Sequence, residues 1–194
     1  MSARFETREA WLVAAVDALR PLFSSVGEEL PAVRVSVGWP GGRGKKNAVI
    51  GQCWATRAAE DKVSQIFISP TQGDAVRILD VLAHELIHAI DDCESGHKGR
   101  FAKIAKAVGL TGKMTATVAG DELKGDLTLI AEKLGAYPHG ILGAGIGGAD
   151  GPKKQGTRML KLEAPCCGYT VRTTRKWIEA GLPSCPCGTE MIAC

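Results

Sequence analysis

Two histidines and a glutamate stand at a spacing that suits metal chemistry: His84, Glu85 and His88 form the pattern His-Glu-x-x-His. In a helix, residues four positions apart lie on the same face, so both imidazoles can reach one ion. Glu85 lies next to the first histidine, where its carboxylate can accept a proton from a metal-bound water. The pattern predicts a zinc-dependent hydrolase, because zinc lowers the pKa of bound water to about 7.

A third ligand is needed, since a catalytic zinc keeps three protein ligands and one open position. His97 is the preferred candidate, because it follows Gly96, which lets the chain turn, and precedes the next helix. Asp91 lies three residues after His88 on the same helix face, and we expect it to orient a ligand imidazole. The competing ligands in this loop are the acidic residues Asp91, Asp92 and Glu94.

The residues around the motif predict the helix that carries it. Apolar residues recur at helical spacing from Val76 to Ile90, and Asp74 is the expected N-cap. A polar loop over 91–99 leads to a second amphipathic helix at about 100–108, which Gly109 can end. The two histidines of the motif therefore lie on a predicted helix.

The other elements predict an α+β fold over residues 1–137, a zincin-like domain with a small mixed or antiparallel sheet and an active-site helix. Periodicity predicts a first helix over 3–24 that Pro21 should limit. Residues 111–121 lack a clear pattern and are expected to be irregular. The predicted strands are 33–37, 48–55 and 63–69, and a shorter helix is predicted near 123–134.

The late cysteines predict a second, structural metal site. Glycine-rich residues 138–157 read as a linker, and residues 158–194 as a small zinc-ribbon-like module with strands at 159–162 and 169–173. Ala164 stands where a two-cysteine knuckle would have its first cysteine, so a degenerate ribbon without metal is the alternative. Cys194 is another possible fourth ligand. The proposed ligands of this second zinc are Cys166, Cys167, Cys185 and Cys187.

Composition and charge narrow the class of protein. The 194 residues are 45% hydrophobic and 23% charged, as in an ordinary globular protein. No secretory signal and no apolar run of 18 residues occur, and seven cysteines are an odd number, so we expect a cytoplasmic protein with no membrane segment and no disulfide framework.

The C-terminal module also carries candidate contacts to DNA. Arg172, Arg175 and Lys176 lie beside Trp177. Basic side chains attract phosphates, and an exposed aromatic ring can stack on a base. The alternatives are a solvated basic tail and a tryptophan that covers the small core of the module.

The stretch HELIHAIDDCESGHKGRF resembles the SprT-like (Spartan-type) metallopeptidase family. In that family a helix with His-Glu-x-x-His is followed by a third histidine in a Gly-His context and then an aromatic residue, here Gly96, His97 and Phe101. The resemblance covers about residues 1–135 and looks strongest to small bacterial and phage proteins, some with a C-terminal zinc ribbon. It implies a zinc-dependent endopeptidase that acts on protein substrates, in some relatives proteins attached to DNA.

Zincins in general suggest two further roles. An extended substrate would pair with an edge strand, for which Gln65–Ser69 is the candidate. A donor for the oxyanion is expected, and Tyr137 is the first candidate, with His139 as another. The alternative role for Tyr137 is simple packing against the domain.

Three functions remain open on the sequence. The first is a zinc endopeptidase recruited by DNA or by a DNA-bound partner. The second is a non-catalytic DNA- or polymerase-associated regulator that keeps the metal-binding fold. The third is a toxin-like or phage-encoded peptidase with one dedicated protein target, which the sequence does not separate from the first. Glu85 favours the first, because a protein that only binds a metal has no need of a base.

Overall fold

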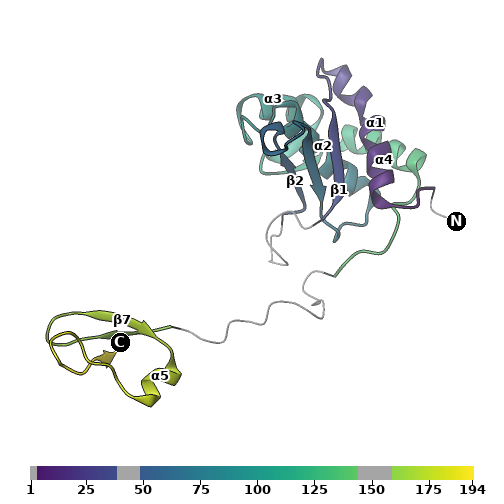
Figure 1. Cartoon of the computed structure of the whole chain (residues 1–194). Helices are drawn as coiled ribbons and strands as arrows, with labels where there is room; N and C mark the ends of the chain where they lie inside the picture. The colour runs from purple at the N-terminus through teal and green to yellow at the C-terminus, as the bar shows by residue number, and fades with distance from the viewer. Residues whose placement is uncertain (1–3, 39–48, 144–158) are drawn as a thin grey trace. The chain divides into compact units, whose positions relative to one another are not determined.

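The computed structural model describes residues 4–38, 49–143 and 159–194 of the chain (Figure 1). The chain divides into two compact units, Met1–Ile146 and Gly147–Cys194. The division falls inside the predicted linker 138–157, of which residues 144–157 lie outside the described part. Helices and small sheets occur together, so the protein is of the α+β class.

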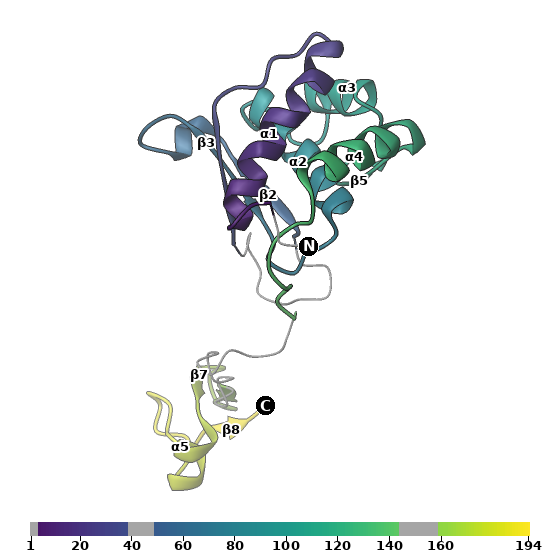
Figure 2. The same cartoon turned by 90° about the vertical axis from the view of Figure 1, so that its right-hand side faces the viewer.

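The first unit alternates helices with short strands and ends in a helix. In chain order its elements are α1 (Arg8–Ser25), β1 (Val33–Val37), β2 (Gly51–Trp54), the 3-10 helix η1 (Thr56–Ala58), β3 (Ser64–Ile68), α2 (Ala75–Ile90), α3 (Gly99–Ala107), β4 (Leu110–Lys113), β5 (Ala116–Ala119) and α4 (Asp121–Leu134). α1 and α4 are in contact and lie side by side in both views (Figures 1 and 2).

The main sheet has the strand order β1-β3-β2. β3 pairs in parallel with β1, where Val35 faces Ile66, and antiparallel with β2, where Cys53 faces Ile66. The predicted edge strand Gln65–Ser69 is therefore wrong, because β3 is the central strand and has a partner on each side. Its apolar run suits a strand enclosed in this way. β2 is the edge strand that lies beside α2.

The core lies against one face of this sheet. Along β3, Ile66 and Ile68 are buried and Gln65 and Phe67 are half-buried, as the two-residue period of a strand requires. α1 contacts β1, and α2 contacts β2 and β3. The largest fully buried side chains of the unit are Trp11, Leu12, Leu19, Phe23, Ile66, Ile68, Ile78, Leu79, Leu82, Leu86, Ile87 and Phe101.

α2 is fixed by local chemistry and by burial. The Asp74 side chain accepts a hydrogen bond of 2.7 Å from the backbone N–H of Arg77, which confirms the predicted N-cap. Most of its residues are buried, including the polar Asp80, Glu85 and His88. Its packing on the sheet holds the histidine-bearing face in place.

Three expectations from the sequence are wrong. α1 begins at Arg8, where the Thr7 side chain caps it by accepting from Ala10 N, and not at residue 3. Pro21 lies inside α1 and does not end it, since the helix continues to Ser25. Residues 111–121 are not irregular: most of them form the antiparallel hairpin of β4 and β5.

A buried guanidinium joins the first helix to the segment after the last. Arg8 is 6% exposed and donates to the carbonyl oxygens of Pro138 (3.0 Å), Pro70 (3.2 Å) and Gly140 (2.6 Å). The backbone N–H of Leu142 also donates to the Pro70 carbonyl, at 3.0 Å. Residues 138–142 therefore belong structurally to the first unit.

The second unit is a small sheet with one short helix. Its described elements are β6 (Leu160–Glu163), β7 (Thr170–Thr173), α5 (Arg175–Ala180) and β8 (Ile192–Ala193), and the strand order is β7-β6-β8. Its core consists of Leu162, Ala164, Cys185 and Met191. A core of this size is too small to stabilise a fold alone.

Across the described segments of both units, no helix combines the length and the apolar character required to cross a membrane.

Candidate metal centre and its cavity

Three imidazoles converge on one point. His84 and His88 project from α2, and His97 from the loop that follows it. The Nε2 atom of His97 lies 3.3 Å from that of His84 and 3.2 Å from that of His88. Zinc–nitrogen bonds of about 2.0–2.1 Å at tetrahedral angles place ligand nitrogens about 3.3–3.4 Å apart. The spacing therefore fits a single ion, and the three predicted ligands are brought together.

One aromatic ring supports all three imidazoles. The centroid of Phe101, in the first turn of α3, lies 4.9 Å from that of His84, 4.3 Å from His88 and 5.1 Å from His97. The ring is fully buried and stacks on His88 at 28°. Because interiors are close-packed, this contact restricts the rotation of each ligand.

Thr117 holds the far side of His84. Its hydroxyl Oγ1 lies 2.8 Å from His84 Nδ1, and the residue is buried in β5. With Nε2 directed to a metal, the Nδ1–H of His84 donates to this hydroxyl and fixes the ring. No local pattern indicates this role, because Thr117 is 33 residues away from His84 in a segment predicted to be irregular.

Burial keeps the imidazoles neutral. Burial, followed by the neighbouring His88 and His97, lowers the pKa of His84 to about 3. Burial and then His97 lower the pKa of His88 to about 4, while Asp91 opposes the shift. Neutral imidazole is the form that binds a metal ion, so the site is ready to bind one near neutral pH.

Glu85 is buried between α2 and β2. The pKa of its carboxyl is raised to about 8, first by burial and then by the Cys93 thiol, while the backbone N–H of Cys53 opposes the shift. A Cβ atom on Gly51 would lie 2.6 Å from Glu85 Oε1 and from Val81 Cγ1. The absence of a side chain at Gly51 is therefore what admits the Glu85 carboxylate.

Hydrogen bonds shape the loop that carries His97. The Asp91 carboxylate accepts from the backbone N–H of Ser95 at 2.7 Å and from its hydroxyl at 3.0 Å. The expectation that Asp91 bonds a ligand imidazole is therefore not met, since its oxygens hold the loop. Gly96 adopts φ +56°, as a turn before His97 requires.

The two other acidic candidates are also engaged elsewhere or exposed. The Asp92 carboxylate accepts from Thr56 N at 2.7 Å and from Thr56 Oγ1 at 3.0 Å. Glu94 is exposed to solvent. Neither belongs to the group of His84, His88 and His97, whose ligand atoms lie within 4.8 Å of one another.

A cavity of about 690 Å³ opens in front of the histidines. β2 forms one wall, α2 and the His97 loop form another, and the β4–β5 turn closes the third. The carbonyl oxygen of Ile50 accepts a hydrogen bond from the backbone N–H of Ser69, so the backbone of Ile50 faces β3. Along a strand, successive residues point their N–H and C=O groups to opposite sides, so those of Gly51 and Cys53 point away from β3. Among the described residues, β2 has a strand partner on one side only.

The predicted oxyanion donors do not reach this cavity. Tyr137 packs edge-on against Trp11, with ring centroids 5.1 Å apart, and lies under the Arg8 guanidinium. His139 bonds the Glu6 carbonyl through Nε2 at 2.9 Å. Neither residue lines the cavity, so the prediction for Tyr137 is wrong and its packing alternative holds.

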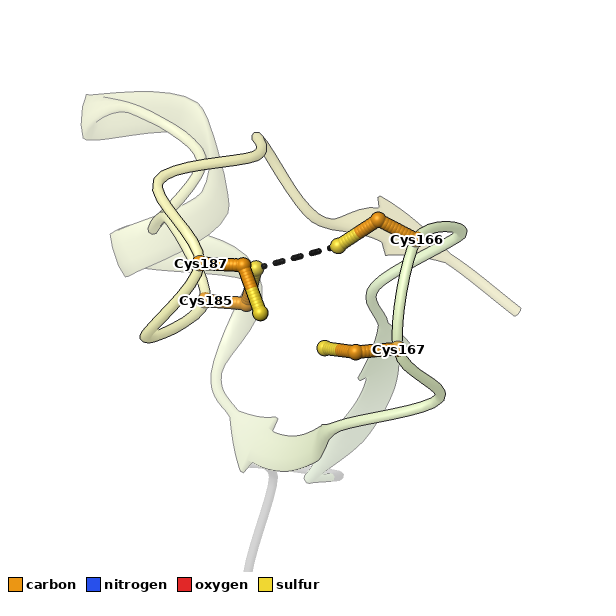
Figure 3. Close-up of side chains that lie close together, drawn as sticks. All are labelled: Cys166, Cys167, Cys185 and Cys187. Atoms are coloured by element: carbon orange, nitrogen blue, oxygen red, sulfur yellow. Dashed lines mark hydrogen bonds between the residues drawn. The ribbon is translucent and has the colours of Figure 1, made fainter.

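The second unit brings four thiols together (Figure 3). Cys166 and Cys167 lie in a turn rather than in an extended strand, so adjacent side chains can both face Cys185 and Cys187. The sulfur atoms of Cys166 and Cys185 are 3.4 Å apart. Cys194 lies outside this group, with its sulfur 3.9 Å from a Glu163 carboxylate oxygen.

The candidate nucleic-acid contacts lie on the surface of the second unit. Arg172, Arg175 and Lys176 are exposed, and Trp177 is 59% exposed. The Lys176 ammonium lies 5.1 Å from the centroid of the Trp177 ring. Trp177 therefore does not cover the core of the unit, which excludes that alternative.

Two groups of side chains in the described parts of the chain could each hold a metal ion, and imidazole nitrogen and cysteine sulfur are donors that zinc prefers. Comparison of this chain with protein-family models, with curated proteins and with solved structures finds no match.

Proposed function

We propose that this protein is a zinc-dependent endopeptidase of the SprT-like type. The observation that carries the proposal is the convergence of three imidazoles beside a buried glutamate, at the wall of an open cavity bounded by an edge strand. A purely structural zinc site needs neither the base nor the cavity. The residues named for this chemistry are His84, His88, His97 and Glu85.

Each residue then has a defined task. A bound zinc ion supplies Lewis acidity and lowers the pKa of a coordinated water to about 7. His84, His88 and His97 hold it, and Thr117 fixes the His84 ring. A zinc dication beside Glu85 would favour the charged form of its carboxyl, which would then accept the proton of the attacking water and deliver it to the departing amine nitrogen of the peptide.

The substrate in this proposal is an extended peptide. β2 offers the outward backbone groups of Gly51 beside Glu85, and an added strand can pair with such an edge. The substrate strand would lie along β2, in place of the predicted Gln65–Ser69, and would pass in front of the histidines. Main-chain pairing gives affinity with little dependence on sequence.

The direct test is cleavage of a denatured test protein by the zinc-loaded chain beside Glu85→Gln. We expect Glu85→Gln to lose activity by at least about 100-fold, the scale of general-base catalysis, and to retain its zinc. Glu94→Gln is the matched control, because Glu94 is an exposed carboxylate of the metal loop. Equal activity of wild type and Glu85→Gln would contradict the proposal.

A second candidate function is a non-catalytic DNA- or polymerase-associated regulator. Exposed Trp177 beside Lys176, with Arg172 and Arg175 on the same small unit, favours contact with nucleic acid in either case. In the endopeptidase proposal the second unit holds a structural zinc on its four cysteines and brings the cavity to proteins on DNA. Zinc-loaded protein that binds single-stranded DNA and cleaves nothing, with or without DNA, would favour the regulator.

A further inference from the structure

Two cysteines from different segments meet on the cavity wall. Cys53 lies on β2, and Cys93 lies in the loop between α2 and α3. The Cys93 thiol donates to the Cys53 carbonyl oxygen, with the sulfur 3.6 Å from the oxygen. Both residues are half-buried and line the cavity, so small solutes in the cavity can reach them. The three histidines complete the metal centre without them.

The backbone at Cys93 is unusual. Asp92 and Cys93 adopt φ values of +45° and +58°, in the left-handed region that residues with a Cβ rarely occupy. At the next two left-handed positions, one in the same loop and one at the start of α3, the chain has Gly96 and Gly99. A cysteine in place of a glycine at 93 carries conformational strain, and strain of this kind concentrates at functional positions.

The neighbouring contacts fix where the Cys93 thiol points. Asp92 is bonded through its carboxylate to Thr56, and its carbonyl oxygen accepts from Arg57 at 3.1 Å. These bonds tie the loop to η1, two residues after β2. The Cys93 sulfur lies 3.6 Å from the backbone carbonyl oxygen of Cys53 itself, so the two cysteines are direct neighbours on the cavity wall.

We propose that Cys53 and Cys93 are an oxidation site, whose conversion to a disulfide by hydrogen peroxide narrows the cavity and stops peptide cleavage. The regulatory half of this statement rests on the proposed peptidase function. Formation of the disulfide does not rest on that function, because it needs only the two thiols and the peroxide.

The chemistry balances with one peroxide. The hydrogen bond from Cys53 lowers the pKa of Cys93, so Cys93 is the attacking thiol. Its sulfur bonds one peroxide oxygen, the O–O bond breaks, and the first water leaves with the thiol proton. The Cys53 sulfur then bonds the Cys93 sulfur, the S–O bond breaks, and the second water leaves. Two thiols lose two electrons and two protons, and the peroxide becomes two waters.

The disulfide would act on the wall that binds substrate. A sulfur–sulfur bond of about 2.05 Å joins β2 covalently to the metal loop. Oxidation removes the thiol proton that Cys93 donates to the carbonyl oxygen of Cys53. The disulfide also holds the loop over this carbonyl group, which faces outward from the edge strand. Because displacements of about 1 Å near a reacting centre cost up to about 100-fold in rate, we expect cleavage to fall by about 10- to 100-fold.

The test treats the zinc-loaded full chain with hydrogen peroxide and compares each protein with its own reduced form. In wild type we expect a peptide that links Cys53 to Cys93 in non-reducing mass spectrometry, loss of cleavage, and recovery with dithiothreitol. Cys53→Ser and Cys93→Ser should keep their oxidised-to-reduced activity ratio near one. Cys194→Ser, an exposed thiol outside both metal groups, should behave as wild type.

Two outcomes would overturn the proposal. One is a disulfide map of peroxide-treated wild type without the Cys53–Cys93 link. The other is equal loss of activity in Cys93→Ser, which would assign the effect to the thiols of the second unit. If reduced wild type cleaves nothing, the proposed peptidase function is wrong, but the disulfide can still be tested. The rate at which a chelator removes zinc from the histidines then measures access to the cavity. That rate should fall on oxidation in wild type and stay constant in Cys93→Ser.

Discussion

His84 and Thr117 are joined by a hydrogen bond of 2.8 Å between Nδ1 and Oγ1, although 33 residues separate them in the chain. The bond connects the helix that carries the metal motif to a hairpin beyond it. It sets the orientation of one of the three converging imidazoles, and in metal sites the loss of an outer partner of this kind typically costs about 10- to 100-fold in metal affinity.

Removal of this hydroxyl should weaken zinc binding. We expect Thr117→Val to lower the zinc affinity of the histidine site by about 10- to 100-fold, as is common for outer partners, and Thr117→Ser to retain it. Competition with a zinc-binding dye measures the affinity. A valine variant with wild-type affinity would show that packing alone orients His84.

The space beside Glu85 depends on one glycine. In Gly51→Ala the new methyl group would lie 2.6 Å from Glu85 Oε1, so the carboxylate must move, and we expect cleavage to fall about 100-fold with zinc still bound. The matched control is Gly125→Ala in α4, where a Cβ atom meets nothing within 4 Å. The control should be as active as wild type and about 1 kcal/mol more stable, since alanine favours helix.

Metal analysis should find two zinc ions per chain. His88→Ala should lose one, and Cys187→Ser, at an exposed position of the other group, should lose the other. Because the core of the second unit is small, we expect its folding to depend on a bound metal, and Cys187→Ser should expose the unit to proteases. One zinc in wild type, with the second unit still resistant to proteases, would support the degenerate ribbon.

The metal-free protein should lose stability as pH falls below about 6.5, the usual pKa of histidine. The pKa values of buried His84 and His88 are lowered to about 3 and about 4, so the unfolded chain takes up protons there that the folded chain does not. The two histidines therefore make stability rise with pH by roughly 2 kcal/mol per pH unit between pH 6 and 5. Glu85, whose pKa is raised to about 8, opposes this with roughly 1 kcal/mol per pH unit, so a net rise remains. Urea unfolding measures it, and the variant with both histidines changed to glutamine should no longer gain stability as pH rises across this window.

Trp177 should contribute to binding of single-stranded DNA. Its exposed ring beside Lys176 suits stacking, so Trp177→Ala should weaken binding by about 1–3 kcal/mol. Fluorescence anisotropy at fixed salt measures the effect. Ile192→Ala, which removes another exposed apolar side chain of the same unit, is the control and should bind normally.

The parts of the site that depend on local sequence were predictable. α2, its Asp74 cap and the shared face of His84 and His88 follow from a helical period and a capping preference. Gly96 signalled the turn that presents His97, and the structure places that imidazole with the other two.

The parts that depend on distant contacts were not predictable. Strand order is decided by which strands pair, so the central position of β3 and the exposed edge of β2 left no local signal. Thr117 acquires its role only when the β4–β5 hairpin packs on α2. Tyr137 lies three residues past a predicted helix, and only tertiary packing against Trp11 reveals that it faces away from the cavity.

The guanidinium of Arg8 has a practical consequence for anyone who wishes to produce the first unit alone. A fragment that stops at residue 137 would delete the carbonyl acceptors at Pro138, His139 and Gly140 and leave a buried cation with one remaining partner, Pro70. Loss of partners for a buried charged donor costs on the order of 2–3 kcal/mol. The shortest sensible truncation therefore ends after Leu142, whose backbone N–H also bonds Pro70.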